Sequence, residues 1–145
     1  LAAAADGIIR YIEDSNSECS CDNDVDPIAN NYVWIEHANG EWTKYSHMVQ
    51  DSVTDLGLTA CAPGSTTVAT CLVSSGDPIG IEGDVGFAGG IHLHFEVGVP
   101  IDDSNPIDSG GWIIGAPRLA RMCHGNVSGG MMEDDESYMA APCVQ

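Results

Sequence analysis

Hydrophobic and polar residues alternate in several short segments of the chain. Residues 6–13, DGIIRYIE, combine an Asp-Gly turn with β-branched and aromatic residues, which is typical of a strand. Residues 31–37 and 41–48 alternate in the same way on either side of an Ala-Asn-Gly sequence, and Asn-Gly is a strong signal for a hairpin turn. The pattern therefore predicts a strand followed by a β-hairpin.

The rest of the chain contains few regular patterns. Residues 14–30 are acidic and rich in turn formers, and residues 50–75 form a long insertion. Residues 77–99 predict two short strands, glycine turns and a further strand near residue 94. Helical periodicity is nearly absent, and residues 117–122, PRLARM, are the one helical candidate. These patterns predict an all-β protein with an antiparallel sheet.

The length of 145 residues is typical of a single domain. We expect a β core over residues 1–100, interrupted by the insertion at 50–75. A loop-rich extension over residues 101–145, closed by a disulfide, is expected to belong to the same domain.

The chain is strongly acidic. Twenty-two Asp and Glu residues face four Lys and Arg residues, which gives a net charge of −18. Such a surface repels phosphate backbones and anionic lipids, so nucleic acids and membrane surfaces are excluded as partners. No hydrophobic stretch reaches the ~20 residues that a membrane-spanning helix requires.

An even number of cysteines in a small chain predicts a set of disulfides and an extracellular, secreted protein. The six cysteines contain no CxxC pair, which disfavours a structural zinc site. Local loop closure favours the pairs Cys61–Cys71 and Cys123–Cys143. Cys19 and Cys21 are too close in sequence for a comfortable bridge with each other, so their pairing is left open.

Residues 89–97, GGIHLHFEV, carry two histidines one residue apart. In a strand, His92 and His94 would project from one face, while Leu93 and Phe95 would turn toward a core. Two imidazoles on one face are either a pair for metal binding and proton transfer or an accident of a polar sheet surface. Isolated histidines such as His37 are more often structural or solvent-exposed.

Two segments together resemble a known family. Residues 32–48, YVWIEHANGEWTKYSHM, and residues 73–97, VSSGDPIGIEGDVGFAGGIHLHFEV, are similar to the core of the lysostaphin-like and β-lytic zinc endopeptidases. The opening residues 2–12 resemble a strand of the same family, so that the resemblance covers roughly residues 2–99. It implies an antiparallel sheet and a secreted enzyme that cuts glycine-rich or peptidoglycan cross-bridge peptides.

The resemblance also implies roles for individual residues. His94 matches the family's zinc ligand, and His92 and His47 match its catalytic histidines. Zinc would polarise the scissile carbonyl and activate water, while the imidazoles would transfer protons. A carboxylate such as Glu96, or a backbone carbonyl, is expected to hold the second ring nitrogen of one histidine.

The family's first zinc motif, a His and an Asp, belongs upstream of the segment that residues 2–12 resemble. A catalytic zinc needs three protein ligands, of which this sequence offers His94. We therefore expect either an upstream segment that supplies the others or a fold kept for non-catalytic work. In the second case the chain would be a structural or cell-wall-binding subunit of a larger extracellular assembly.

Three weaker signals lie outside this pattern. Residues 22–26, DNDVD, have the alternating carboxylates of a calcium loop, but Pro27 stands where an EF-hand loop requires glycine, so a solvated acidic loop is favoured over calcium. Asn126 begins a glycosylation sequon. Tyr32 and Tyr45 are expected to be sheet residues, with assistance to an oxyanion as the alternative.

Overall fold

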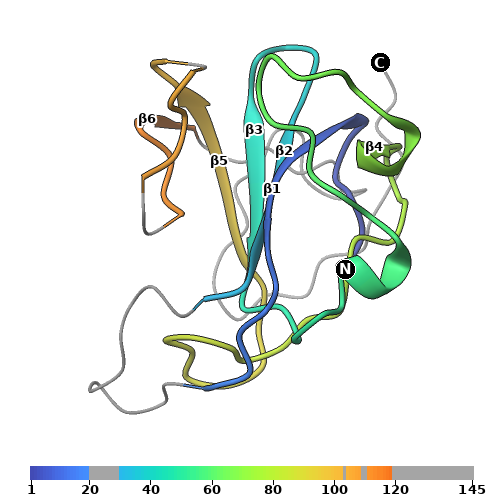
Figure 1. Cartoon of the computed structure of the whole chain (residues 1–145). Coiled ribbons are helices and arrows are strands. Elements are labelled where there is room, and N and C mark those ends of the chain that lie inside the picture. The colour runs from blue at the N-terminus through green and yellow to red at the C-terminus, as the bar shows by residue number, and fades with distance from the viewer. Residues whose placement is uncertain (20–29, 103, 109–110, 119–145) are drawn as a thin grey trace, which may run out of the picture.

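The computed structural model describes residues 1–19, 30–102, 104–108 and 111–118. Six strands form one antiparallel sheet in the order β4-β1-β2-β3-β5-β6 (Figure 1). Their bounds are β1 Gly7–Glu13, β2 Tyr32–Glu36, β3 Trp42–Ser46, β4 Leu72–Val73, β5 His94–Pro100 and β6 Gly115–Arg118. The predicted all-β class with an antiparallel sheet is thus confirmed.

The predicted hairpin is present as β2 and β3, each shorter than its sequence pattern. The turn between them is closed by hydrogen bonds of 2.9 Å from the His37 and Gly40 amides, to Glu41 O and His37 O. Gly40 has a φ of 80°, a left-handed conformation that glycine adopts without steric cost. The Asn-Gly signal therefore marked the turn correctly.

One face of the sheet packs on the main hydrophobic core. Alternate residues of β1, β2 and β3 point into it, and the loops after β3 and β4 add further apolar side chains. The fully buried members include Ile9, Val33, Ile35, Met48, Val53 and Ile79. Leu93 and Phe95 pack against this cluster, as expected for the apolar neighbours of the histidine pair.

The other face of the sheet is aromatic and charged. The strand register sets Trp34 beside Lys44 and Lys44 beside Glu96 across β2, β3 and β5. The Trp34 indole donates a 2.9 Å hydrogen bond to Gly111 O, so the segment beyond β5 is tied down onto this face. Gly111 has a φ of 76°, and a Cβ atom there would collide with the Tyr32 ring.

The predicted insertion at residues 50–75 contains regular structure. It holds the 3₁₀ helices η1 (Thr54–Leu56) and η2 (Ala69–Cys71) and ends in β4, which pairs with β1. The predicted Cys61–Cys71 disulfide is confirmed, with a Cα–Cα distance of 5.8 Å. Cys19 is also disulfide-bonded, whereas the predicted Cys123–Cys143 pair lies outside the described residues.

One expectation from the sequence is wrong. Residues 77–93 contain isolated bridges, Ala2–Pro78 and Met48–Glu82, instead of two short strands, because their many glycines favour turns over ladders. Of the helical candidate at 117–122, Pro117 and Arg118 belong to β6, which pairs with β5 over Gly115–Arg118. Its other four residues lie outside the described residues.

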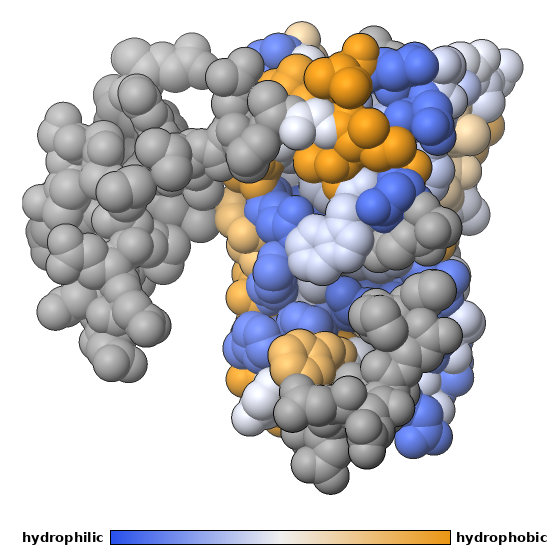
Figure 2. Space-filling model, turned by 90° about the vertical axis from the view of Figure 1, so that its left-hand side faces the viewer, coloured by the Kyte–Doolittle hydropathy of each residue, from blue (hydrophilic) through white to orange (hydrophobic). Residues whose placement is uncertain are grey.

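Large exposed hydrophobic side chains lie mainly in loops. They include Ile81, Phe87 and Ile91 before β5 and Ile101 after it. Figure 2 shows the side of the molecule where β5 and β6 lie, on which hydrophobic residues gather at the upper end and hydrophilic residues cover the middle. Among the described residues, no helix has the length and hydrophobicity needed to span a membrane.

Candidate active site

Three histidines meet at the end of the sheet where β3 finishes and β5 begins, the lower end in Figure 1. His47 directly follows β3, His94 is the first residue of β5, and His92 lies two residues earlier. The ring centroid of His47 is 4.7 Å from that of His92 and 5.8 Å from that of His94. The structure therefore brings together all three histidines for which the family resemblance implies a role.

The backbone of His47 explains how it joins the other two. Regular alternation along β3 would turn its side chain away from the face of Ser46, which is paired with His94. His47 instead has a φ of 63°, a left-handed conformation that is uncommon for a residue with a Cβ atom. This conformation costs on the order of 1–3 kcal/mol and is typical of functional sites. The departure from strand geometry sets the imidazole beside His92 and His94.

The His47 side chain is held in one orientation. It is 6% exposed, and its Nδ1 lies 2.8 Å from Val85 O. A carbonyl oxygen only accepts hydrogen bonds, so Nδ1 carries the hydrogen and donates it. The lone pair of the neutral ring is then on Nε2, which is free to accept a proton.

The surroundings of His47 hold its pKa below the ordinary histidine value of about 6.5. Burial is the main cause, the hydrogen bond to Val85 O opposes it, and the nearby His92, His94 and Lys44 lower the pKa further. The histidine signals in an NMR titration should show His47 protonating only at a pH below about 6.5. A midpoint at or above that value would contradict the structure.

The same shift sets the sign of a pH effect on stability. The unfolded chain takes up the His47 proton first as the pH falls through about 6.5, because its pKa is the higher of the two. The contribution of neutral His47 to stability is therefore complete above that pH and declines as the pH falls toward the folded-state pKa.

His92 does not lie in a strand, so the expectation that it shares a strand face with His94 is wrong. β5 begins at His94, and the His92 amide instead donates a 3.2 Å hydrogen bond to Gly83 O. The His92 ring is exposed and its Nδ1 donates to Gly90 O at 2.9 Å, which leaves Nε2 facing no described partner. The loop before β5, and not alternation along a strand, therefore brings His92 close to the other histidines.

His94 contacts Glu96, the carboxylate named as an acceptor in the sequence analysis. Glu96 Oε1 lies 2.7 Å from His94 Nε2. Two lone pairs would repel at this distance, so Nε2 carries a hydrogen and Nδ1 is the free acceptor of the neutral ring. Among the described residues, no group forms a hydrogen bond with Glu96 Oε1. The approach of His94 Nε2 to this oxygen is therefore a close electrostatic contact.

Sequence reasoning missed Lys44. Its side chain is 1% exposed, with its Nζ 3.6 Å from Glu96 Oε1 and 3.9 Å from the centre of the Trp112 ring. Burial lowers the pKa of Lys44, and the Glu96 carboxylate opposes that shift. The register that places Lys44 beside Glu96 depends on pairing between β3 and β5, which no local sequence pattern reveals.

A zinc ion is not accommodated by the described residues alone. These residues contain no group of three His, Cys, Asp or Glu side chains that could hold a metal. His94 offers one oriented donor, Nδ1, whereas a catalytic zinc needs three protein ligands. The calcium candidate at residues 22–26 and the Asn126 sequon lie outside the described residues.

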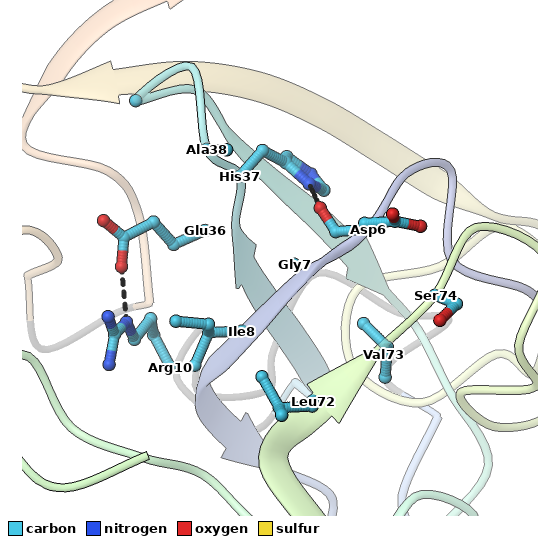
Figure 3. Close-up of a pocket in the computed structure, with 11 residues that line it drawn as sticks. Asp6, Gly7, Ile8, Arg10, Glu36, His37, Ala38, Leu72, Val73 and Ser74 are labelled. Carbon is cyan, nitrogen blue, oxygen red and sulfur yellow. Dashed lines mark hydrogen bonds and ion pairs between the residues drawn. The ribbon is translucent and has the colours of Figure 1, made fainter. Parts of the chain in front are cut away.

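A hollow of about 540 Å³ lies at the opposite end of the sheet from the three histidines, beside the β2–β3 turn (Figure 3). Its polar groups already have partners within the protein. Arg10 Nε lies 2.5 Å from Glu36, and the two ring nitrogens of His37 bond to Asp6 O and Thr43 Oγ1 at 2.9 and 2.8 Å. His37 is therefore structural, as the sequence analysis favours.

The two tyrosines have structural contacts. The Tyr45 hydroxyl accepts a 2.8 Å hydrogen bond from the Ala4 amide and is buried. The Tyr32 ring lies against Lys44, whose Nζ is 5.4 Å from the ring centre. Neither contact points to a role in stabilising an oxyanion.

No protein-family model and no curated protein matches the chain. Among solved structures, it is similar to the catalytic domain of a mutant of the prophage-encoded M23 protein EnpA from Enterococcus faecalis. The identity is 19% and the TM-score 0.43, over 68% of this chain and 58% of that one.

A zinc containing peptidase from Vibrio cholerae is similar at 24% identity and a TM-score of 0.43, over 79% of this chain and 23% of that one. The chain thus spans less than two thirds of either protein. The first of these proteins is described as an M23 protein and the second as a zinc containing peptidase. The geometry of the histidines carries the functional proposal.

Proposed function

We propose that the protein is a secreted endopeptidase of the lysostaphin-like type, which hydrolyses glycine-rich or peptidoglycan cross-bridge peptides. The observation that carries the proposal is the left-handed backbone of His47, which brings its ring within 4.7 Å of His92. Strain at a single residue that gathers three imidazoles is more readily explained by chemistry than by packing.

The two catalytic candidates are suited to proton transfer. His47 is neutral near physiological pH because burial lowers its pKa, and its Nε2 is a base. This nitrogen would remove a proton from the attacking water. His92 is exposed and held through Nδ1, so its Nε2 would take up a proton from solvent and deliver it to the leaving amine, while the proton on His47 returns to solvent.

In this proposal, His94 would bind zinc together with ligands from outside the described residues. One donor cannot hold a catalytic zinc, so no step above depends on the metal. The secreted location is supported by the Cys61–Cys71 disulfide, since such bonds persist in oxidising compartments. A peptide substrate agrees with the net charge of −18, which repels polyanions.

The test is to purify the full-length protein with zinc present, measure its zinc-to-protein ratio by elemental mass spectrometry and assay pentaglycine cleavage. We expect a ratio near one and cleavage that is lost in His94→Ala. The Glu36→Gln variant, at the far end of the sheet, is the matched control and should cleave as the wild type does. Full activity in His94→Ala would overturn the proposal.

A second candidate function is favoured by one observation. Among the described residues, no group of three His, Cys, Asp or Glu side chains could hold a metal ion. The chain would then be a non-catalytic, structural or cell-wall-binding subunit of an extracellular assembly. A zinc ratio near zero, with binding but no cleavage of pentaglycine or cell-wall peptides, would support it.

A further inference from the structure

Lys44 is an unusual residue to bury. The chain has only four Lys and Arg residues against 22 Asp and Glu, yet this lysine is 1% exposed. Removing an ammonium group from water costs several kcal/mol unless close partners compensate. The contacts of Lys44 must therefore compensate the cost of its burial.

The surroundings of Lys44 consist of aromatic rings and a carboxylate. The centres of the Trp112, Tyr32 and Trp34 rings lie 3.9, 5.4 and 5.7 Å from Nζ. Attraction between a cation and an aromatic face is strongest when the pair is removed from water. Glu96 supplies the opposite charge at 3.6 Å, so the ammonium group fixes the position of the carboxylate.

The same carboxylate oxygen contacts the histidine cluster. Glu96 Oε1 is 2.7 Å from His94 Nε2, and this contact decides which nitrogen of His94 carries the hydrogen. Carboxylates that hold a histidine in this way fix both its tautomer and its ring orientation. Lys44 thus acts on His94 indirectly, through Glu96.

Trp112 contacts both Lys44 and His94. Its ring covers Lys44 and also meets His94 edge-on, with 5.9 Å between ring centroids. Its backbone is fixed, because the Trp112 amide donates to Asp108 Oδ1 and the Asp108 amide donates to Trp112 O, each at 2.9 Å. The ring therefore excludes water from one side of the Lys44–Glu96 pair.

We propose that Lys44 and Trp112 are positioning residues, which hold the Glu96 carboxylate so that His94 keeps its hydrogen on Nε2 and presents Nδ1 as the free acceptor. The proposal deepens the peptidase function, on which it rests for its consequence in catalysis. The Arg10–Glu36 ion pair lies at the other end of the sheet, away from the three clustered histidines, so it provides the matched comparison.

The test is proton NMR of the full-length protein, in which the Nε2–H signal of His94 is identified by its absence in His94→Gln. Close contact with the Glu96 oxygen should shift this hydrogen downfield, and the neighbouring Trp112 ring should slow its exchange with water. We expect the signal in the wild type and in Glu36→Gln. It should be lost in Glu96→Gln and in Lys44→Met, which keeps the length of the side chain and removes its charge.

Kinetics supply the second readout. We expect kcat for pentaglycine cleavage to fall about 10–100-fold in Lys44→Met, with KM little changed, because outer partners of a functional histidine have effects of that size. If Lys44→Met does not fold, Trp112→Leu replaces it, since Trp112 is 47% exposed and its loss removes only the cover. That variant should weaken the Nε2–H signal.

The outcomes separate the two proposals. A wild-type His94 that carries its hydrogen on Nδ1, or an Nε2–H signal unchanged in folded Lys44→Met or Trp112→Leu, would overturn the positioning role even if peptides are cleaved. A signal that depends on Lys44 in a protein that cleaves no peptide would support the positioning role and overturn the peptidase proposal instead.

Discussion

Replacement of His92 by alanine is expected to slow peptide hydrolysis by about 10²–10⁴-fold, the usual contribution of a positioned acid or base. The His92 ring is exposed, and its one hydrogen bond among the described residues lies within its own loop, to Gly90 O. Its removal should therefore leave the melting temperature almost unchanged. The measurement is kcat/KM with pentaglycine, together with a thermal melt of the same sample.

His37 is the matched control for this loss. Both of its ring nitrogens bond within the protein, far from the cluster, and it is buried. His37→Ala should therefore lower the melting temperature and leave kcat/KM close to the wild-type value. If His92→Ala retained full activity, a catalytic role for that residue would have to be abandoned.

Replacement of Trp34 by alanine is expected to lower the free energy of unfolding by about 3–5 kcal/mol, as is typical of a large aromatic residue in a core. The side chain is fully buried, packs against Trp42 with 6.4 Å between ring centroids, and lies beneath Lys44. Folded domains are stable by about 5–15 kcal/mol, so this loss is a large fraction of the total. Urea denaturation followed by fluorescence measures it.

The Trp34→Phe variant separates packing from hydrogen bonding. It keeps a ring in place but removes the indole N–H that donates to Gly111 O, which costs about 1–3 kcal/mol where the acceptor stays buried. A loss well below that of Trp34→Ala is expected. Equal losses in the two variants would mean that the hydrogen bond, and not the ring, holds the segment beyond β5.

Local patterns predict the fold better than they predict the site. The β2–β3 hairpin follows from its Asn-Gly turn, and the Cys61–Cys71 bond follows from a short spacing between cysteines. Both depend on residues close in sequence. The all-β class could be predicted for the same reason, since alternation within each strand is a local property.

The site depends on contacts between distant segments. Lys44 and Glu96 are 52 positions apart in the sequence and meet only because β3 pairs with β5 in one register. His92 joins His47 through a glycine-rich loop, whose path strand alternation does not describe. The family resemblance identifies the three histidines, but neither it nor local pattern indicates the aromatic enclosure of Lys44.

The two edges of the sheet affect how the protein behaves at high concentration. Within the described residues, β4 has only two residues and β6 has four, including Pro117, which has no N–H group to offer to another chain. Short edge strands and proline leave little backbone on which a second molecule could add a strand. Together with mutual repulsion at a net charge of −18, this favours dispersed molecules over fibrils formed by sheet extension.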